Sequence, residues 1–401
     1  MDDVRPAYGG RCFADIPGAV VRLLTGAGEG GLDPDVLGDL DRRWSRVALV
    51  LVDAFGWSCA ERHAEHPFLR RVVAEGRLAR LTSQFPSTTS AHMTTLHSGL
   101  PVGETGIYEW FQLEPALDRV IAPLLFSYAG DDERETLRAS DIDPGSLYPA
   151  ATLYERLAAQ GVSSSAVQHA AIADTTFSRA TLRGATVRPF GDGTGWAFCV
   201  AAALREPGYV VAYVDDVDAT GHHHGPESDA HIAGATGVLD TLETLAQALP
   251  ADGETLLLVT ADHGQMQVDP ETTVFVNEAW PEIVDHLRRG ADGRPLAPAG
   301  SARDLFLHVL PGRVDEVASR LQGLLGDLAS VRPTAALLAS GHFGQAGPRL
   351  RERIGDIVVL PGPGATVWWR EPERFDMQFH GHHGGLSPAE MLIPLAALPI
   401  G

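Results

Sequence analysis

The sequence has little cysteine and lacks any long apolar run. Its three cysteines, Cys12, Cys59 and Cys199, show no CxxC spacing, which disfavours a disulfide framework and a cysteine-based zinc site and predicts free, buried thiols. No apolar stretch reaches the roughly 18 to 20 residues that span a bilayer. The first residues also lack the basic patch and apolar run of a secretory signal. We therefore expect a cytoplasmic protein without a membrane partner.

Basic residues are scarce as well. The 401 residues include 31 Lys and Arg against 52 Asp and Glu, a formal net charge of -21. Such a surface repels nucleic-acid backbones and anionic membranes at long range. Duplex DNA is therefore not an expected partner, although local cations can still capture a small phosphate ester. The hydrophobic content of 44% is typical of a globular protein.

Apolar runs of strand length alternate with helical segments along the chain. A continuous apolar run bounded by polar residues is typical of a strand buried on both faces. The predicted strands cover residues 46–52, 79–83, 209–214, 255–260 and 391–398, and the helices include 91–98, 151–160 and 232–249. This alternation predicts βαβ units, hence an α/β fold with a mostly parallel central sheet flanked by helices.

The pattern changes after about residue 265. Residues 304–310 and 357–360 read as strands and residues 314–325 as a helix, with Gly- and Pro-rich joints between them. We predict a small inserted α+β cap subdomain at residues 266–375. Residues 1–265 and 376–401 would then form the main α/β core.

Carboxylate and imidazole side chains follow the predicted strands. In a parallel sheet, ligands sit beyond the carboxyl ends of the strands, so these side chains are expected at one edge. The candidates are Asp53, Asp218, His222, Asp262, His263 and the Gly-flanked His383. Asp218 and His222 are expected on one tight loop. Each residue alone has a simpler explanation as a cap, turn or solvated loop, but together they predict a metal site. Mixed Asp and His ligands suit Zn²⁺, with Mn²⁺ or Fe²⁺ as competitors.

A hydroxyl-rich segment at residues 85–92 precedes the predicted helix at 91–98. A hydroxyl side chain here would lie at a helix N-terminus, where free N–H groups and the helix dipole favour an anion. Capping of the helix by Ser or Thr is the alternative. Three carboxylates beside two divalent ions would leave about one positive charge, which favours an anionic substrate.

These segments together make the chain resemble the type I phosphodiesterase/nucleotide pyrophosphatase family of the alkaline phosphatase superfamily. The resemblance covers about residues 45–398 and is carried by Asp53, Phe85–Thr89, Tyr213–His222, Ala261–Gly264 and His383–Ser387. It implies an alkaline-phosphatase-like fold and a hydrolase of phosphodiester or pyrophosphate bonds, with small nucleotide-type substrates.

The resemblance also implies a role for each site residue. Thr89 corresponds to the nucleophile, which forms a phospho-threonine intermediate at two divalent ions, most often zinc. One ion would be held by Asp218, His222 and His383, and the other by Asp53, Asp262, His263 and the Thr89 oxygen.

The expected substrate contacts depart from the family pattern at two positions. Ser90 follows Thr89 where relatives commonly carry an aromatic residue, and Trp110 stands where they commonly carry an Asn that binds the phosphoryl group. The backbone N–H of Ser90 is the candidate replacement donor. Trp110 and Phe55 are expected either in the substrate pocket or in the core, and Arg303 either at a substrate anion or at the surface.

Three other functions remain open at this stage. A phosphomonoesterase of this superfamily usually carries an Arg soon after the nucleophile, and residues 90–100 contain no Arg or Lys, which favours diesters or pyrophosphates. A phosphonate hydrolase is a further alternative. A catalytically silent metal-binding protein would be expected to lose Thr89 or a ligand, and none is lost. The oligomeric state does not follow from the sequence.

Overall fold

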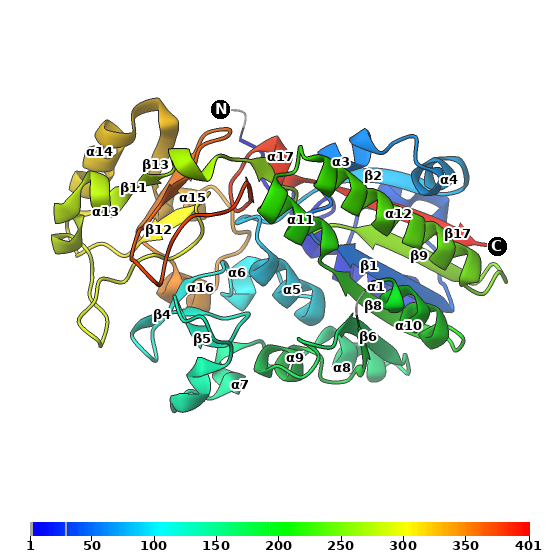
Figure 1. Cartoon of the computed structure of the whole chain (residues 1–401). Helices are drawn as coiled ribbons and strands as arrows, with labels where there is room; N and C mark the ends of the chain where they lie inside the picture. The colour runs from blue at the N-terminus through cyan, green and yellow to red at the C-terminus, as the bar shows by residue number, and fades with distance from the viewer. Residues whose placement is uncertain (1–2, 29, 192) are drawn as a thin grey trace.

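A seven-stranded sheet forms the centre of the structure (Figure 1). The computed structural model describes residues 3–28, 30–191 and 193–401. Met1 and Asp2, which belong to the segment that lacks the pattern of a secretory signal, lie outside the described residues. The strand order is β2-β17-β9-β1-β8-β6-β7. The strands are β1 (Arg46–Val52), β2 (Arg77–Thr82), β6 (Ser164–His169), β7 (Thr186–Phe190), β8 (Gly208–Val214), β9 (Thr255–Thr260) and β17 (Leu392–Ile400).

The sheet is mostly parallel, as predicted. Strand β1 pairs in parallel with β8 and β9, and β6 pairs in parallel with β7 and β8. Strand β17 is antiparallel to both of its neighbours, β2 and β9. The sequence pattern missed β6 and β7. Strand β6 is rich in Ser, and β7 is an edge strand that contains Pro189, so neither shows a long apolar run.

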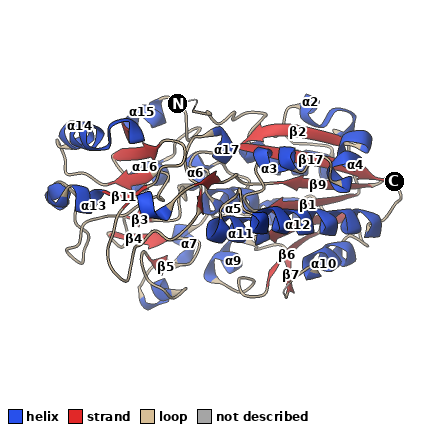
Figure 2. Cartoon of the chain, turned by 45° about the horizontal axis from the view of Figure 1, so that its top comes forward, coloured by secondary structure: helices blue, strands red, loops and turns tan. Residues whose placement is uncertain are grey.

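Helices flank the sheet in two groups (Figure 2). Helix α12 (Asp229–Ala248) packs between α4 (Pro67–Glu75) and α10 (Gly195–Ala203), and α5 (Thr89–Ser98) packs between α1 (Ile16–Thr25) and α8 (Leu153–Ala158). Shorter helices include α3 (Trp57–Arg62), α6 (Val102–Thr105), α9 (Thr176–Thr181) and α17 (Pro388–Met391). Among the described helices, none combines the length and apolarity needed to cross a bilayer.

A second apolar core lies in the yellow-to-orange lobe of Figure 1. Its centre is the antiparallel sheet β12-β14-β13, with β12 (Leu305–Leu307), β13 (Ala329–Pro333), β14 (Ile357–Pro361) and α14 (Val314–Leu325). This core also takes in Phe85, Tyr108 and Leu113 from the earlier chain, near the small sheet of β3 (Gln112–Glu114), β4 (Arg119–Ala122) and β5 (Ser127–Tyr128). The second core therefore extends beyond residues 266–375, and the division into two domains stays a prediction.

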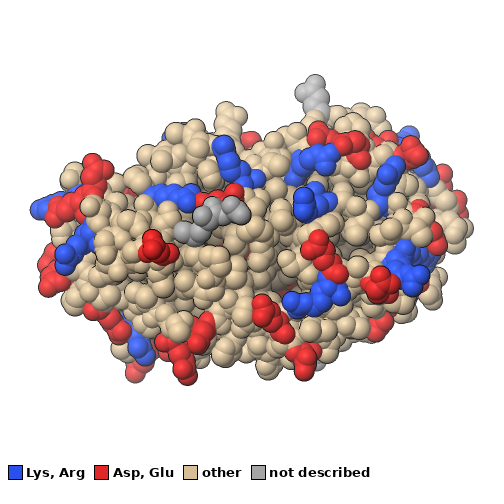
Figure 3. Space-filling model, turned by 90° about the horizontal axis from the view of Figure 1, so that it is seen from above, with Lys and Arg blue, Asp and Glu red and all other residues tan. Residues whose placement is uncertain are grey.

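The surface mixes charges of both signs. Figure 3 shows Asp and Glu interspersed with basic side chains on the face seen from above, and exposed ion pairs such as Arg183–Glu155 are common. The cysteines are free, as expected, with Cys12 and Cys59 buried and Cys199 half-buried.

A buried ion pair joins the second core to helix α17, which directly precedes strand β17 of the central sheet. Arg303, 1% exposed, donates from Nε and Nη2 to the carboxylate of Glu390 at 2.9 and 2.8 Å. Its Nη1 donates to the carbonyls of Gly362 and Ala365. The prediction that Arg303 contacts a substrate anion is therefore wrong, because its guanidinium is committed inside the protein, and it is not a surface arginine either.

We expect Arg303→Met to lower the free energy of unfolding by about 3 to 5 kcal/mol, because Glu390 would stay buried without its partner. Urea denaturation followed by circular dichroism measures this loss. The matched control is Arg313→Met, since Arg313 pairs with Glu316 at the surface, where both side chains are 53% exposed, and should change stability little. A variant that kept its stability and lost only substrate affinity would contradict the assignment.

Buried histidines should make the fold sensitive to acid. Burial, with a smaller contribution from Arg288, lowers the pKa of His308 to about 3, whereas an unfolded histidine titrates near about 6.5. The unfolded chain therefore binds a proton that the folded chain does not. Stability should fall by about 1.4 kcal/mol per pH unit for each such group as the pH drops below about 6.5.

His308→Leu removes one of these protons. Between pH 7 and pH 5, we expect the variant to lose about 2 kcal/mol less stability than the wild type. Urea denaturation at the two pH values checks this difference. Equal losses in the two proteins would show that His308 is not held neutral by burial.

Candidate active site

The ends of three neighbouring strands place the acidic residues at one edge of the sheet. Val52 of β1 lies opposite Val214 of β8, and Leu51 lies opposite Thr260 of β9, so the three strands end nearly level. Asp53 follows β1 directly. Because parallel strands deliver their carboxyl ends to the same edge, residues about 160 to 210 positions apart meet here, as the hydrogen bonds of Asp53 with Tyr213 and of Ala54 with Asp262 show.

Asp218 and His222 lie on helix α11 (Asp216–His224), and the prediction of a tight loop for this segment is wrong. Their spacing of four residues puts both side chains on one helix face. The Nε2 atom of His222 lies 3.3 Å from Oδ1 of Asp218. The helix thus gives the pair a more rigid support than a loop would.

Six candidate ligands fall into two groups of three. Asp218, His222 and His383 form one group, and Asp53, Asp262 and His263 form the other, with the donor atoms of each group within 4.8 Å of one another. In the second group, Nε2 of His263 lies 3.4 Å from both an Asp53 oxygen and an Asp262 oxygen. The grouping is the one that the resemblance implied.

Backbone carbonyls orient all three histidines of these groups. Each Nδ1 atom contacts one carbonyl oxygen, at 2.8 Å between His222 and Gly381, 3.1 Å between His263 and Gly264, and 2.9 Å between His383 and Ser87. A carbonyl only accepts hydrogen bonds, so Nδ1 is the donor in each case and Nε2 is the ring atom that faces the candidate ligands. A neutral imidazole held in this way can ligate a metal through Nε2.

The carboxylates of the two groups lie close enough to repel one another. Burial, together with the charges of Asp262 and Asp218, raises the pKa of Asp53 well above its usual value. Burial also raises the pKa of Asp262, although the nearby His263 acts to lower it. The Oδ2 atom of Asp262 is buried with no hydrogen-bond partner in the part of the chain that the structure describes. Divalent cations at these donors would remove both the repulsion and the unpaired oxygen.

Thr89 begins helix α5 and faces the second group. Its Oγ1 atom lies 3.3 Å from Asp53 Oδ2 and 3.2 Å from His263 Nε2, and the residue is only 6% exposed. Thr88, not Thr89, occupies the N-cap position of the helix. Helix capping therefore does not explain Thr89, whose hydroxyl points at candidate ligands.

His92 holds the segment that leads into Thr89, and the sequence interpretation missed it. Its Nδ1 atom lies 2.7 Å from the Thr88 carbonyl, and its Nε2 atom accepts a hydrogen bond from the Gln84 backbone N–H at 2.9 Å. Burial lowers the pKa of His92 to about 3, so the ring stays neutral and can accept as well as donate. In the sequence, the indication of this contact is that His92 follows Thr88 by four residues, which is one helical turn.

Tyr213 and Gln265 support the ligands and were also missed. The Tyr213 hydroxyl donates to Asp53 Oδ2, and the Gln265 side-chain amide donates to Asp218 Oδ1 at 2.6 Å. A Cβ on Gly221 would lie 1.7 Å from Oε1 of Gln265, so a larger residue here would require this amide to move. Tyr213 precedes the Asp-rich segment by two residues and Gln265 follows His263 by two, which was the only signal in the sequence.

A cavity of about 360 Å³ opens beside Thr89, and we name it the catalytic pocket. Its walls combine the candidate ligands with aromatic and apolar side chains. They include Thr89, Asp218, His222, His383, Trp110, Phe111, Trp368, Arg374, Phe375, Met377 and Phe379. Trp110 thus lies where a substrate contact was predicted, and Arg374 is the cationic side chain of the described lining.

Two other predicted contacts lie elsewhere. Phe55 is buried in the core of the central sheet and is not part of the pocket lining, so its prediction as a substrate contact is wrong. The side chain of Ser90 is fully buried. A role for its backbone N–H at the start of α5 stays a prediction.

Comparison with known proteins agrees with this geometry. The model of the type I phosphodiesterase/nucleotide pyrophosphatase family matches residues 47–386, whereas none of the curated proteins matches the chain. Murine ectonucleotide pyrophosphatase/phosphodiesterase 5, solved as an inactive variant in complex with AMP, has a TM-score of 0.65 at 18% identity over 88% of this chain and 87% of that chain. The human protein gives 0.64 at the same identity and coverage.

The structural likeness confirms the alkaline-phosphatase-like α/β fold. The family model covers most of the chain, and the family implies divalent metal ions and small phosphate-ester substrates. The chain is therefore a member of the type I phosphodiesterase/nucleotide pyrophosphatase family and a hydrolase of that type.

Proposed function

We propose that the chain hydrolyses phosphodiester or pyrophosphate bonds of small nucleotide-type substrates, with Thr89 as nucleophile at two divalent metal ions. The observation that carries the proposal is the position of the Thr89 hydroxyl, 3.3 Å from Asp53 and 3.2 Å from His263. Thr89 also lines the catalytic pocket together with Asp218, His222 and His383.

The donor sets fit zinc best. Each group combines carboxylate oxygen with neutral imidazole nitrogen, and three protein ligands leave a coordination position open, as in catalytic zinc sites. Mn²⁺ and Fe²⁺ can compete for the same donors. Bound ions would lower the pKa of a ligated hydroxyl and neutralise charge on the phosphoryl oxygens.

The side chains of this protein would act in two steps. Asp53 and His263 hold the Thr89 oxygen in place, the hydroxyl loses its proton to solvent, and the oxygen attacks phosphorus. A bond forms between Thr89 and phosphorus while the bond to the leaving oxygen breaks. The free N–H groups at the start of α5, Ser90 among them, are placed to stabilise the negative phosphoryl oxygens. Water then cleaves the phospho-threonine and restores Thr89.

The shape of the catalytic pocket supports a substrate with a flat, apolar group. Trp110, Phe111 and Trp368 line the pocket, and Phe111 stacks on Trp368 with ring centroids 6.2 Å apart. A nucleobase offers a suitable face for such side chains. The complex of the murine relative with AMP is consistent with this substrate class.

A phosphomonoesterase or phosphonate hydrolase is the second candidate. Arg374 in the pocket lining supplies one positive charge that could hold an additional charge of a dianionic phosphate. Residues 90–100 supply none, which favours the diester. The cytoplasmic location and the absence of a duplex nucleic-acid partner stay predictions.

We expect Thr89→Ala to reduce turnover at least about a thousandfold, since the attacking oxygen is removed. Release of p-nitrophenol from bis-p-nitrophenyl phosphate by the zinc-loaded protein measures this loss. Metal analysis should still find two ions per chain, and Thr89→Ser, which keeps a hydroxyl, should recover part of the rate. Full activity in Thr89→Ala would refute the mechanism.

The same zinc-loaded protein should cleave bis-p-nitrophenyl phosphate faster than p-nitrophenyl phosphate. The reason is that the described pocket offers a single arginine for the extra negative charge of the monoester. Initial rates at equal concentrations of the two compounds decide the matter. A faster monoester reaction would favour the second candidate.

A further inference from the structure

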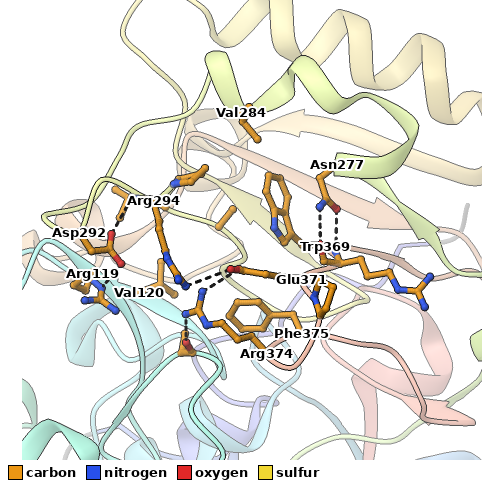
Figure 4. A pocket seen from close by; sticks show the side chains of 16 residues that line it. Arg119, Val120, Asn277, Val284, Asp292, Arg294, Trp369, Glu371, Arg374 and Phe375 are labelled. Atoms are coloured by element: carbon orange, nitrogen blue, oxygen red, sulfur yellow. Dashed lines mark hydrogen bonds and ion pairs between the residues drawn. The ribbon is translucent and has the colours of Figure 1, made fainter.

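A second cavity, of about 230 Å³, lies on the far side of one wall of the catalytic pocket. Figure 4 shows it between strand β4, the loop at residues 292–297 and the segment at 369–375. Four arginines line it, Arg119, Arg294, Arg370 and Arg374, and we name it the arginine pocket. Such a concentration of guanidinium groups stands out in a chain whose net charge is -21.

The four arginines of this pocket have four carboxylates around them, but the pairs are shared unevenly. Arg119 pairs with Asp292 at 3.2 Å, and Arg370 lies near Glu278 and Asp376, at 3.8 and 4.0 Å. Arg294 and Arg374 share a single carboxylate. Glu371 lies 3.3 Å from Arg294 and 2.9 Å from Arg374, so these two guanidinium groups have one carboxylate between them.

Glu371 occupies the place that an anionic ligand would take. Its carboxylate bridges two guanidinium groups (Figure 4), which is an arrangement that also suits a phosphate group. The backbone of Glu371 is fixed by two hydrogen bonds with Phe375, at 3.1 and 2.9 Å. The Glu371 side chain is only partly buried, and that of Arg294 is 56% exposed, so both can turn without disrupting the hairpin that Glu371 and Phe375 close at residues 371–375.

Aromatic side chains complete the site. Trp368 and Trp369 are neighbours in the chain and point to opposite sides, so Trp368 lines the catalytic pocket and Trp369 lines the arginine pocket. Phe375 and Arg374 line both. Thr89 and the candidate metal ligands do not line the arginine pocket, so the two cavities share Arg374 and Phe375 but not the residues proposed to carry out the reaction.

We propose that the arginine pocket binds a small organic phosphate. Its phosphate group replaces the Glu371 carboxylate between Arg294 and Arg374, and its ring lies against Trp369 and Phe375. The cavity volume suits a molecule about as large as a phosphorylated ring. Binding on this side of the hairpin would press on the wall that the two pockets share.

Phenylphosphonate is a suitable probe, because it carries a phosphonate dianion and a ring but no ester bond. Calorimetric titration of the zinc-loaded protein should resolve a binding event in addition to any at the metal ions. We expect Arg294→Gln to weaken that event at least about tenfold through the loss of a charge-assisted contact. Glu371→Gln should strengthen it, because the internal competitor loses its charge.

Arg313→Gln is the matched control, since Arg313 is 53% exposed, pairs with a carboxylate and lies outside both pockets. It should leave the affinity unchanged, and Arg294→Gln should keep its diester turnover. Equal phenylphosphonate affinities in the wild type, Arg294→Gln and Glu371→Gln would overturn the proposal. So would an equal loss in Arg313→Gln, which would mean unspecific attraction. Inorganic phosphate binding as tightly as phenylphosphonate would overturn the ring contact.

Discussion

Mutual repulsion of three carboxylates, of which Asp53 and Asp262 are buried and Asp218 is half-buried, is the constraint on which the rest of the site depends. Asp53 and Asp262 sit at the ends of adjacent central strands, and Asp218 faces them from the first turn of α11. Burial, together with the charges of Asp262 and Asp218, raises the pKa of Asp53, so the folded chain holds like charges together at a cost in stability. The protein offsets part of that cost with fixed donors, namely Tyr213 for Asp53 and Gln265 for Asp218.

Thr89, the proposed nucleophile, begins a polar helix that the fold buries completely. Helix α5 has every residue buried, although Ser, Thr and His make up most of it. Several of these side chains donate to backbone carbonyls of the same helix, as Thr94 does to the Ser90 carbonyl and Ser98 does to the Thr94 carbonyl. His92 adds the hydrogen bonds that fix the turn before Thr89. A buried, hydrogen-bonded helix start gives the Thr89 hydroxyl one position relative to the ligands.

One segment near the end of the chain shapes both pockets. Residues 367–379 supply Trp368, Met377 and Phe379 to the catalytic pocket and Trp369 to the arginine pocket. Because alternate residues of an extended chain point to opposite sides, a single segment can serve two cavities. Substrate selection and any response to a second ligand would therefore depend on the same short stretch.

The sequence by itself determined the α/β fold, the central strands and the six candidate ligands with Thr89. Long apolar runs indicate buried strands directly. Parallel strands also end at the same edge of the sheet, irrespective of the segments that connect them. Only the tertiary structure showed that Arg303 and Phe55 are buried inside the protein and that residues 218–222 are helical. It also revealed the supporting contacts of His92, Tyr213 and Gln265. It also placed Trp110 in the lining of the same cavity as Trp368. Side-chain direction and contacts across hundreds of residues depend on how the elements pack, and no local pattern encodes that packing.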